Sequence, residues 1–209
     1  MSQQDINQQK VDIIVLGASG HAKVVIDLIE KQEQFQIIGL IDDDPTLNGQ
    51  EIYGYKVLGD KEELENQSCK QCVIAIGDNQ VRNDLEYWLE INGFVLVKSI
   101  SHPSSQLARG VSIGNGSVVM AGSVVNSDTN IARNTIINTG ATIDHDCNIG
   151  NDVVISKARG QWFQKEIGMV KPWIIASFHP AFLMRQPEQK KLAWIDLKMI
   201  RDKSKILKI

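Results

Sequence analysis

The sequence lacks the features that mark membrane proteins and disulfide-rich secreted proteins. None of its apolar runs approaches the roughly 18 residues that a bilayer-spanning helix needs. The N-terminal segment MSQQDINQQK is polar throughout, which argues against a secretory signal. Only three cysteines are present, and this small odd number argues against a disulfide framework. We therefore expect a cytoplasmic protein of one large or two small domains, with no membrane partner.

Positive charge is scarce in most of the chain and concentrated near its C-terminal end. Residues 1–155 hold 10 Lys and Arg residues against 21 Asp and Glu residues, whereas residues 156–209 hold 12 against 4. Three of the four tryptophans also lie in residues 156–209. This shift indicates two segments with different origins or different partners.

An aliphatic residue recurs at every sixth position in the second half of the chain. The members are Leu107, Ile113, Val119, Val125, Ile131, Ile137, Ile143, Ile149 and Ile155. Neither the helix period nor the strand period produces a strict repeat of six, whereas a hexapeptide parallel β-helix does. The alternative is a run of short strands in an ordinary sandwich. We predict a β-helix over residues 102–155, with about two and two-thirds coils and the aliphatic residues pointing inward.

Alternating strands and helices precede the hexads. The expected strands are 11–16, 36–41, 57–58, 72–76 and 94–100, and the expected helices are 22–32 and 79–92. This order predicts a small, open, Rossmann-like α/β sheet over residues 11–101. Residues 1–10 are expected to be a mobile leader.

Three loops of this α/β region could form a ligand site at one edge of the sheet. Gly17-Ala-Ser-Gly20-His21 joins a strand to a helix, and such a glycine turn lets backbone N–H groups approach an anion. It lacks the third glycine of the dinucleotide fingerprint, so a simple tight turn remains open. Asp42 and Asp43 follow the second strand, where an acidic residue often meets a ribose, although a solvated turn is equally possible. The Gly77-Asp78-Asn79 loop ends another strand at the same edge, with Asn79 as the expected helix N-cap.

Two further groups could carry chemistry. Cys69-Lys-Gln-Cys72 has no second cysteine pair and opens a strand, so we interpret it as structural and expect no metal. His145 lies between Asp144 and Asp146, on the outside of the predicted β-helix. An imidazole that a carboxylate holds in one tautomer can act as a general base near neutral pH. A plain surface histidine is the alternative.

The motifs of residues 11–155 are similar to those of one enzyme family. They are Gly17-Ala-Ser-Gly-His-Ala-Lys-Val-Val25, Leu40-Ile-Asp-Asp-Asp44, Ala75-Ile-Gly-Asp-Asn79 with Arg82, and Asn138-Thr-Gly-Ala-Thr-Ile-Asp-His-Asp-Cys147. The region resembles the left-handed β-helix sugar acetyltransferases, the sialic acid O-acetyltransferase and bacillosamine N-acetyltransferase family. The resemblance implies a Rossmann-like domain for a UDP-sugar or sialic acid, a β-helix that forms a homotrimer, and acetyl-CoA as co-substrate between neighbouring β-helices.

The resemblance also implies roles for individual residues. His145 would be the catalytic base, Asp146 its acidic partner, and Asn138 a residue near the acceptor. The substrate-binding set would be Gly17, Ser19, Gly20, His21, Lys23, Asp42, Asp43, Gly77, Asp78, Asn79 and Arg82. A family histidine that contacts acetyl-CoA maps onto Val154, which cannot form a hydrogen bond, and the hexads stop at Ile155. We therefore expect impaired acetyl transfer, with a non-catalytic nucleotide-sugar-binding module as the alternative.

Residues 156–209, an α-containing basic tail, are similar to a different family. The similar runs are Arg159-Gly-Gln-Trp162, His179-Pro-Ala-Phe-Leu-Met-Arg185-Gln-Pro187 and Lys190-Lys-Leu-Ala-Trp-Ile-Asp-Leu197. They resemble the C-terminus of the iron–sulfur uracil-DNA glycosylases of family 4, in which His179 and Arg185 would contact DNA. The cluster cysteines and the uracil-binding residues of that family have no counterpart here. A glycosylase remnant with non-specific DNA binding is therefore only a third hypothesis.

Overall fold

The computed structural model describes residues 10–155, 162–164, 173–175 and 190–207. It divides into two compact units, Met1–Val154 and Ile155–Ile209. The expected leader, residues 1–10, lies outside the described residues except for its last position. None of the helices in the described ranges combines the length and apolar character that crossing a membrane requires.

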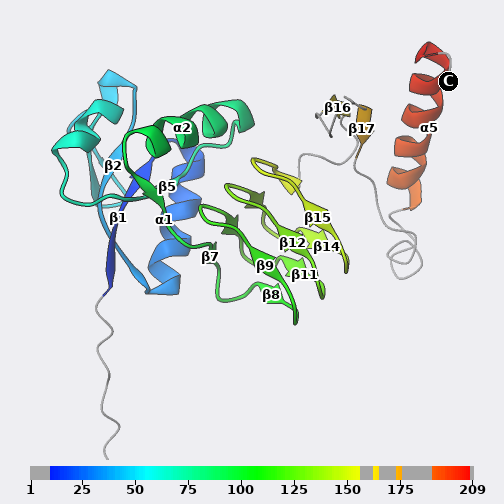
Figure 1. The fold of residues 1–209 in the computed structure, drawn as a ribbon, viewed down its shortest axis with the longest axis horizontal. Helices are drawn as coiled ribbons and strands as arrows, with labels where there is room; N and C mark the ends of the chain where they lie inside the picture. Colours follow the sequence, from blue (N-terminus) through cyan, green and yellow to red (C-terminus); the bar gives the residue numbers. More distant parts are fainter. Residues whose placement is uncertain (1–9, 156–161, 165–172, 176–189, 208–209) are drawn as a thin grey trace, which may run out of the picture. The chain divides into compact units, whose positions relative to one another are not determined.

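An α/β domain with a mixed six-stranded sheet comes first, as expected (Figure 1). Its strands are β1 (Val11–Leu16), β2 (Phe35–Ile41), β3 (Glu51–Ile52), β4 (Tyr55–Gly59), β5 (Gln71–Ile74) and β6 (Val95–Leu96). Its helices are α1 (Gly20–Gln32), η1 (Pro45–Leu47), η2 (Lys61–Asn66) and α2 (Asn79–Ile91). The strand order is β3-β4-β2-β1-β5-β6, in which only β3 runs antiparallel to its neighbour. The strand expected at 57–58 is β4, an inner strand because β3 pairs with its outer side.

Both faces of this sheet are buried, which explains the continuous apolar character of its central strands. Ile13 and Val15 of β1 face one core with α1, whereas Ile14 and Leu16 face a second core with Leu89 of α2. This alternation is the ordinary consequence of the two-residue period of a strand.

The hexads form a parallel β-helix, which confirms the predicted fold. Its strands are β7 (Ile100–Ser101), β8 (Gln106–Leu107), β9 (Ser112–Ile113), β10 (Val118–Val119), β11 (Val124–Val125), β12 (Asn130–Ile131), β13 (Ile136–Ile137), β14 (Thr142–Ile143) and β15 (Asn148–Ile149). They build three sides: side 1 (β7, β10, β13), side 2 (β8, β11, β14) and side 3 (β9, β12, β15). Partners along each side are 18 residues apart, as Leu107, Val125 and Ile143 show.

The β-helix has three full coils because it begins at Ile100, earlier than expected. The pattern missed β7 because Ser101, not an aliphatic residue, holds the hexad position there. Most hexad residues are buried, including Val119, Val125 and Ile137. Leu107 is exposed at 42%, since no strand precedes β8 on side 2, and Ile113, Ile149 and Ile155 are half-buried.

The turns of the β-helix share one backbone feature that the hexad analysis did not include. Three positions after the aliphatic residue, the backbone enters the left-handed region at every turn from Gly110 to Asp152. The eight residues are Gly110, Gly116, Gly122, Asp128, Asn134, Gly140, Asp146 and Asp152, with φ between 54° and 82°. Only glycine, asparagine and aspartate occur there, the residue types that tolerate this conformation best.

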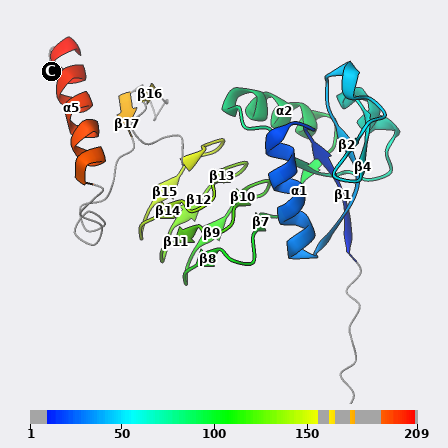
Figure 2. The ribbon, with the colours of Figure 1, turned by 180° about the vertical axis from the view of Figure 1, so that it is seen from behind.

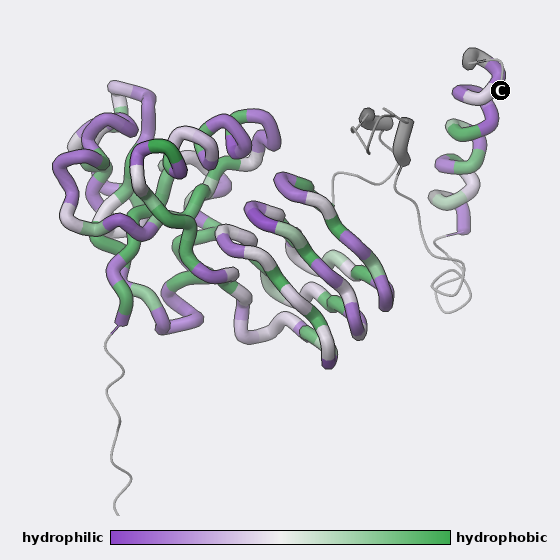
Figure 3. Tube along the Cα trace, in the orientation of Figure 1, coloured by the Kyte–Doolittle hydropathy of each residue, from purple (hydrophilic) through white to green (hydrophobic). Residues whose placement is uncertain are grey.

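The corners of the β-helix differ in their surroundings. We name the docked corner (residues 114–117, 132–135 and 150–153) and the exposed corner (residues 108–111, 126–129 and 144–147). Side 1 packs against α1, since Val118 and Ile136 share a core with Val25 and Ile29. Helix α2 lies beside the docked corner, as Figures 1 and 2 show from opposite sides. The hydropathy of the trace follows this plan, with apolar strands and hydrophilic turns (Figure 3).

The second unit contains a short antiparallel pair and one long helix. The pair is β16 (Trp162–Gln164) with β17 (Trp173–Ile175), and the helix is α5 (Lys190–Leu207). This helix agrees with the α-containing basic tail expected for residues 156–209. Trp194 and Leu197 are exposed on α5, whereas Ala193 and Asp196 are buried.

Candidate functional site

The glycine turn after β1 is held by backbone and carboxylate hydrogen bonds. Gly17 has a φ of 110°, and a Cβ there would lie 2.9 Å from the Ala75 carbonyl oxygen, so only glycine fits. Helix α1 begins at Gly20, with Ser19 as its N-cap, and Lys23 lies exposed in its first turn. Helix N-termini favour anions because their first N–H groups have no partner within the helix. The turn is therefore suited to an anionic ligand.

Asp42, at the end of β2, reaches the same turn. Its Oδ2 accepts a hydrogen bond from the Ala18 N–H at 2.7 Å, and its Oδ1 accepts one from the Asp44 N–H at 3.0 Å. Asp43 instead accepts from the Lys61 N–H at 3.1 Å and is exposed. The predicted neighbourhood of Gly17 and Asp42 is thus present, and it places a carboxylate beside the N-terminus of α1.

The third loop of this edge, Gly77-Asp78-Asn79, is organised around α2. Asp78, not Asn79, is the N-cap: its Oδ1 accepts from the N–H groups of Gln80 (2.9 Å) and Val81 (3.0 Å). This correction arises because Asp78 has the extended backbone of an N-cap, whereas Asn79 is already helical. Arg82 is 0% exposed and binds carbonyl oxygens of the chain. Its burial does not fit the direct substrate contact that the resemblance implied, and favours a structural link.

His145 lies on the exposed corner, in contact with the carboxylate expected for it. Its Nδ1 lies 2.6 Å from Oδ2 of Asp146, and the His145 side chain is 63% exposed. Asp146 bends toward the ring from a left-handed backbone conformation, with a φ of 57°. If Nδ1–H donates to this carboxylate, Nε2 carries the lone pair and can accept a proton.

The electrostatics of this corner favour the protonated imidazole. The hydrogen bond to Asp146 raises the pKa of His145 above its usual value, and the charges of Asp144 and Asp146 add to the effect. Asp144 is itself fixed, since its Oδ1 accepts the backbone N–H of His145 at 3.0 Å. The corner therefore presents a basic imidazole in a negative field, an arrangement suited to taking a proton from a cationic or neutral acceptor.

Asn138 lies at the opposite end of β14 from His145, on the corner between sides 1 and 2. The structure does not bring these two predicted residues together within one chain. Val154 is buried at 4% exposure and pairs with Ile136 at the start of a fourth coil. Its side chain belongs to the core, so it offers no polar atom to a ligand.

Two of the three cysteines, Cys69 and Cys72, lie at the start of β5. Cys72 is buried in β5, and burial raises its pKa to about 12. Cys69 Sγ donates to the Asp12 carbonyl oxygen at 3.2 Å. Among the described residues, no cluster of three or more His, Cys, Asp or Glu side chains could hold a metal ion. The CxxC pair is best interpreted as structural.

The residues that resemble a uracil-DNA glycosylase fall mostly outside the described residues. This applies to His179 and Arg185, and to residues 159–161. The described part of that segment is α5, whose sequence from Lys190 to Leu197 is helical.

Comparison with known proteins places the α/β domain and the β-helix in one group. The family model described as the PglD N-terminal domain matches residues 12–88. Among solved structures, PerB from Caulobacter crescentus, solved with CoA and GDP-perosamine, is 36% identical, with a TM-score of 0.61. The match covers 68% of this chain and 66% of PerB. No curated protein sequence matches the chain significantly.

Two further structures give the same result. The acetyltransferase domain of PglB from Neisseria gonorrhoeae, in complex with acetyl coenzyme A, is 30% identical over 67% of each chain, with a TM-score of 0.59. WeeI from Acinetobacter baumannii is 27% identical over 68% of each chain, with a TM-score of 0.58. The chain thus spans about two thirds of the length of these relatives.

Proposed function

The chain belongs to the family of left-handed β-helix acetyltransferases with a PglD-type N-terminal domain, and we propose that it transfers an acetyl group from acetyl-CoA to a nucleotide-linked amino sugar. The observation that carries the proposal is the contact of 2.6 Å between His145 and Asp146 on the exposed corner. Relatives that bind CoA with GDP-perosamine, or acetyl coenzyme A, support the choice of co-substrate and acceptor class.

An amine acceptor suits the charge of the exposed corner better than a hydroxyl. Asp128, Asp144 and Asp146 all lie on this corner, and they attract an ammonium group to His145. The ammonium first releases one proton to solvent, and Nε2 of the neutral His145 would accept a second proton as the amine nitrogen attacks the thioester carbonyl carbon. The carbon–sulfur bond then breaks, and the leaving CoA thiolate takes up a proton. The products are an N-acetylated sugar and CoA.

The nucleotide would lie at the carboxyl edge of the sheet. The glycine turn (Gly17, Ser19, Gly20) would receive the phosphates, with His21 and Lys23 following in α1. Asp42 and Asp43 would face the ribose or base, and the Gly77-Asp78-Asn79 loop would close the other side. The Asp42 carboxylate is already oriented by the Ala18 N–H, so it needs no reorganisation to accept a hydroxyl.

The separate positions of the proposed nucleotide site and of His145 within one chain favour a homotrimer. We name the carboxyl edge of the sheet, with its loops Gly17–Gly20, Asp42–Asp43 and Gly77–Asn79, the nucleotide edge. It lies beside the docked corner, because α2 begins at this edge and contacts that corner. His145 lies on the exposed corner, which is one hexad of chain away from the docked corner. Six extended residues span at most about 20 Å. A neighbouring chain that brought its exposed corner to this edge would complete the site. A trimeric mass in sedimentation experiments supports this arrangement, and a strictly monomeric mass contradicts it.

A direct assay tests the proposal. Purified chain is mixed with acetyl-CoA and a UDP- or GDP-linked amino sugar, and free CoA thiol and acetylated sugar are measured. We expect slow transfer, because Val154 stands where a polar contact to acetyl-CoA is expected and the hexads end at Ile155. Transfer by a His145→Gln variant at the wild-type rate would refute the role of this residue.

The buried, apolar Val154 favours a second candidate, a nucleotide-sugar-binding module without catalysis. Calorimetry separates the two candidates, since only an enzyme should bind both the nucleotide sugar and acetyl-CoA. The glycosylase hypothesis has no support from the comparisons, and release of uracil from a labelled oligonucleotide would be needed to revive it.

A further inference from the structure

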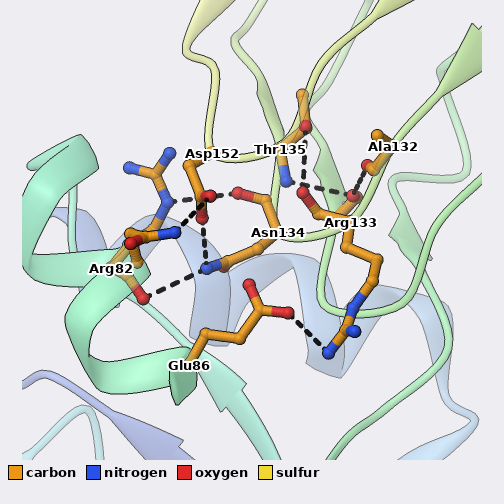
Figure 4. Close-up of polar contacts among 9 residues, drawn as sticks. Arg82, Glu86, Ala132, Arg133, Asn134, Thr135 and Asp152 are labelled. Atoms are coloured by element: carbon orange, nitrogen blue, oxygen red, sulfur yellow. Dashed lines mark hydrogen bonds and ion pairs between the residues drawn. The ribbon is translucent and has the colours of Figure 1, made fainter. Parts of the chain in front are cut away.

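Arg82 connects two parts of the first unit that are distant in the sequence. It belongs to α2, is 0% exposed, and is the largest fully buried polar side chain among the described residues. One end of its guanidinium reaches the loop before α2. The other end reaches the docked corner of the β-helix (Figure 4). The nucleotide edge and the β-helix are therefore linked through one side chain.

The first contact holds the loop that ends β5. Nη1 of Arg82 donates to the carbonyl oxygens of Ile76 (3.3 Å) and Gly77 (3.1 Å). The same nitrogen lies 3.3 Å from Oδ1 of Asn79. These bonds fix the direction of the peptide planes in this loop, and therefore the direction in which its N–H groups point.

The second contact holds the docked corner, and it is reciprocal. Nε of Arg82 donates to the Asn134 carbonyl oxygen at 3.2 Å, while Nδ2 of Asn134 donates to the Arg82 carbonyl oxygen at 3.2 Å. Nδ2 of Asn134 also donates to Oδ1 of Asp152 at 2.8 Å, which ties in the next coil. Asn134 can point at α2 in this way because its backbone is left-handed, with a φ of 54°.

Neighbouring pairs strengthen the same contact. Asn83 Nδ2 donates to Oδ2 of Asp152 at 3.0 Å, and Arg133 lies 2.6 Å from Glu86. Helix α2 therefore touches two successive coils of the docked corner through polar groups. Such a contact has a defined register, unlike an apolar surface that could slide.

A buried guanidinium is a costly way to join two domains. Burial lowers the pKa of Arg82, although the charges of Asp152, Asp78 and Glu86 oppose the shift. Nη2 of Arg82 is buried without a hydrogen-bond partner within the structure. Removing one member of a buried polar cluster leaves its partners without their hydrogen bonds, which is destabilising. The directional bonds of Arg82 are what an apolar residue could not replace.

We propose that Arg82 is a positioning residue that holds the Gly77–Asn79 loop in its ligand-binding conformation against the docked corner. The statement about the ligand rests on the proposed function, whereas the coupling of loop and corner does not. A substitution on the β-helix should therefore loosen a loop of the α/β domain that the substituted residue does not contact.

Amide hydrogen exchange of the purified chain tests this coupling without any ligand. Asn134→Gly keeps the left-handed backbone and removes two hydrogen bonds to α2 and the next coil. We expect the amides of residues 77–81 to exchange about tenfold faster, the effect of losing one net buried hydrogen bond. The matched control is Asp128→Gly, the same hexad position on the exposed corner, and it should leave these amides unchanged. Equal exchange in wild type and Asn134→Gly would overturn the proposal.

Nucleotide binding then tests the consequence for the ligand. Arg82→Lys keeps the charge, and Arg82→Met keeps the volume, but neither can bridge loop and corner through a planar guanidinium. We expect calorimetry with UDP and GDP to show about tenfold weaker binding in both variants, with circular dichroism at the assay temperature showing that each variant is folded. Wild-type affinity in both variants would refute the positioning role. If the wild type binds neither nucleotide, the proposed function fails at that point, while the exchange result still decides the coupling.

Discussion

The docked and exposed corners of the β-helix have the same backbone and opposite roles. Each carries a series of left-handed residues, Asn134 and Asp152 on one, Asp128 and Asp146 on the other. On the docked corner, Asn134 is buried against α2 and its amide is used for packing. On the exposed corner, Asp146 is open to solvent and orients His145. The same position of the repeat thus holds a packing residue on one corner and, on the other, a residue that orients the candidate catalytic base. The difference depends on whether another element packs against the corner.

This difference shows that the residue types at the left-handed turn positions do not by themselves indicate function. Asparagine or aspartate is accepted at these positions because it tolerates a positive φ. The same carboxylate or amide then finds a partner in its surroundings. Four predictions test this interpretation, each with a matched control.

The largest effect is expected at His145. His145→Gln removes the proton acceptor, and the rate of acetyl transfer should fall by about 10²–10⁴-fold. The matched control is Asn151→Ala, because Asn151 holds the same hexad position on the docked corner and is exposed. A comparable loss in the control would mean that the corners do not differ in chemistry.

The next effect concerns stability, and it should be larger on the docked corner. Asn134→Ala places at a positive φ a residue that, unlike asparagine, cannot form local hydrogen bonds. It also removes one buried and one part-buried hydrogen bond. We expect a loss of about 2–4 kcal/mol in urea unfolding. Asp128→Ala carries only the backbone cost, about 1 kcal/mol. Equal losses would show that the contact with α2 contributes nothing.

A smaller effect compares Gly116, on the docked corner, with Gly122, on the corner between sides 1 and 2. Gly116 and Gly122 have φ values of 73° and 66°, so alanine is strained at both. A Cβ at Gly116 would lie 2.6 Å from Cδ1 of Leu96, whereas a Cβ at Gly122 meets nothing within 4 Å. Gly116→Ala should therefore cost about 1–3 kcal/mol more than Gly122→Ala, because the α/β domain must yield. Thermal and urea unfolding of both variants measure the difference.

The smallest effect is a shift of a pH profile. The raised pKa of His145 means that its neutral, basic form predominates only above that pKa, so acetyl transfer should rise with pH through it. Asp146→Asn removes the main cause of the raised pKa, and the rise should move to lower pH. Asp128→Asn is the control, since Asp128 is not among the groups that raise this pKa. An unchanged profile for Asp146→Asn would remove Asp146 as the partner.

Much of the fold could be predicted from local patterns. The bounds of β1, α1 and α2 agree with the expected ones to within two residues, because apolar runs and glycine turns act locally. β7 was missed because it starts the first coil with Ser101, outside the aliphatic pattern. Asp78 and Asn79 are both good N-caps, and only the backbone showed which one caps α2.

The candidate site was predicted in part, and the features that the prediction missed have physical reasons. The contact of His145 with Asp146 is between neighbours, so the sequence could suggest it. The burial of Arg82 depends on a β-helix corner 52 residues later in the chain, which no local pattern contains. The series of Gly, Asn and Asp three places after each aliphatic residue was visible, and it would have predicted the left-handed turns.

The sequence by itself determined the α/β sheet, the hexad repeat and the left-handed turns, since each depends on residue type and spacing along the chain. Only the tertiary structure decided which corner α2 covers, and hence that Asn134 packs while His145 remains accessible. The physical reason is that burial depends on the packing of distant elements. The repeat alone makes all its corners alike.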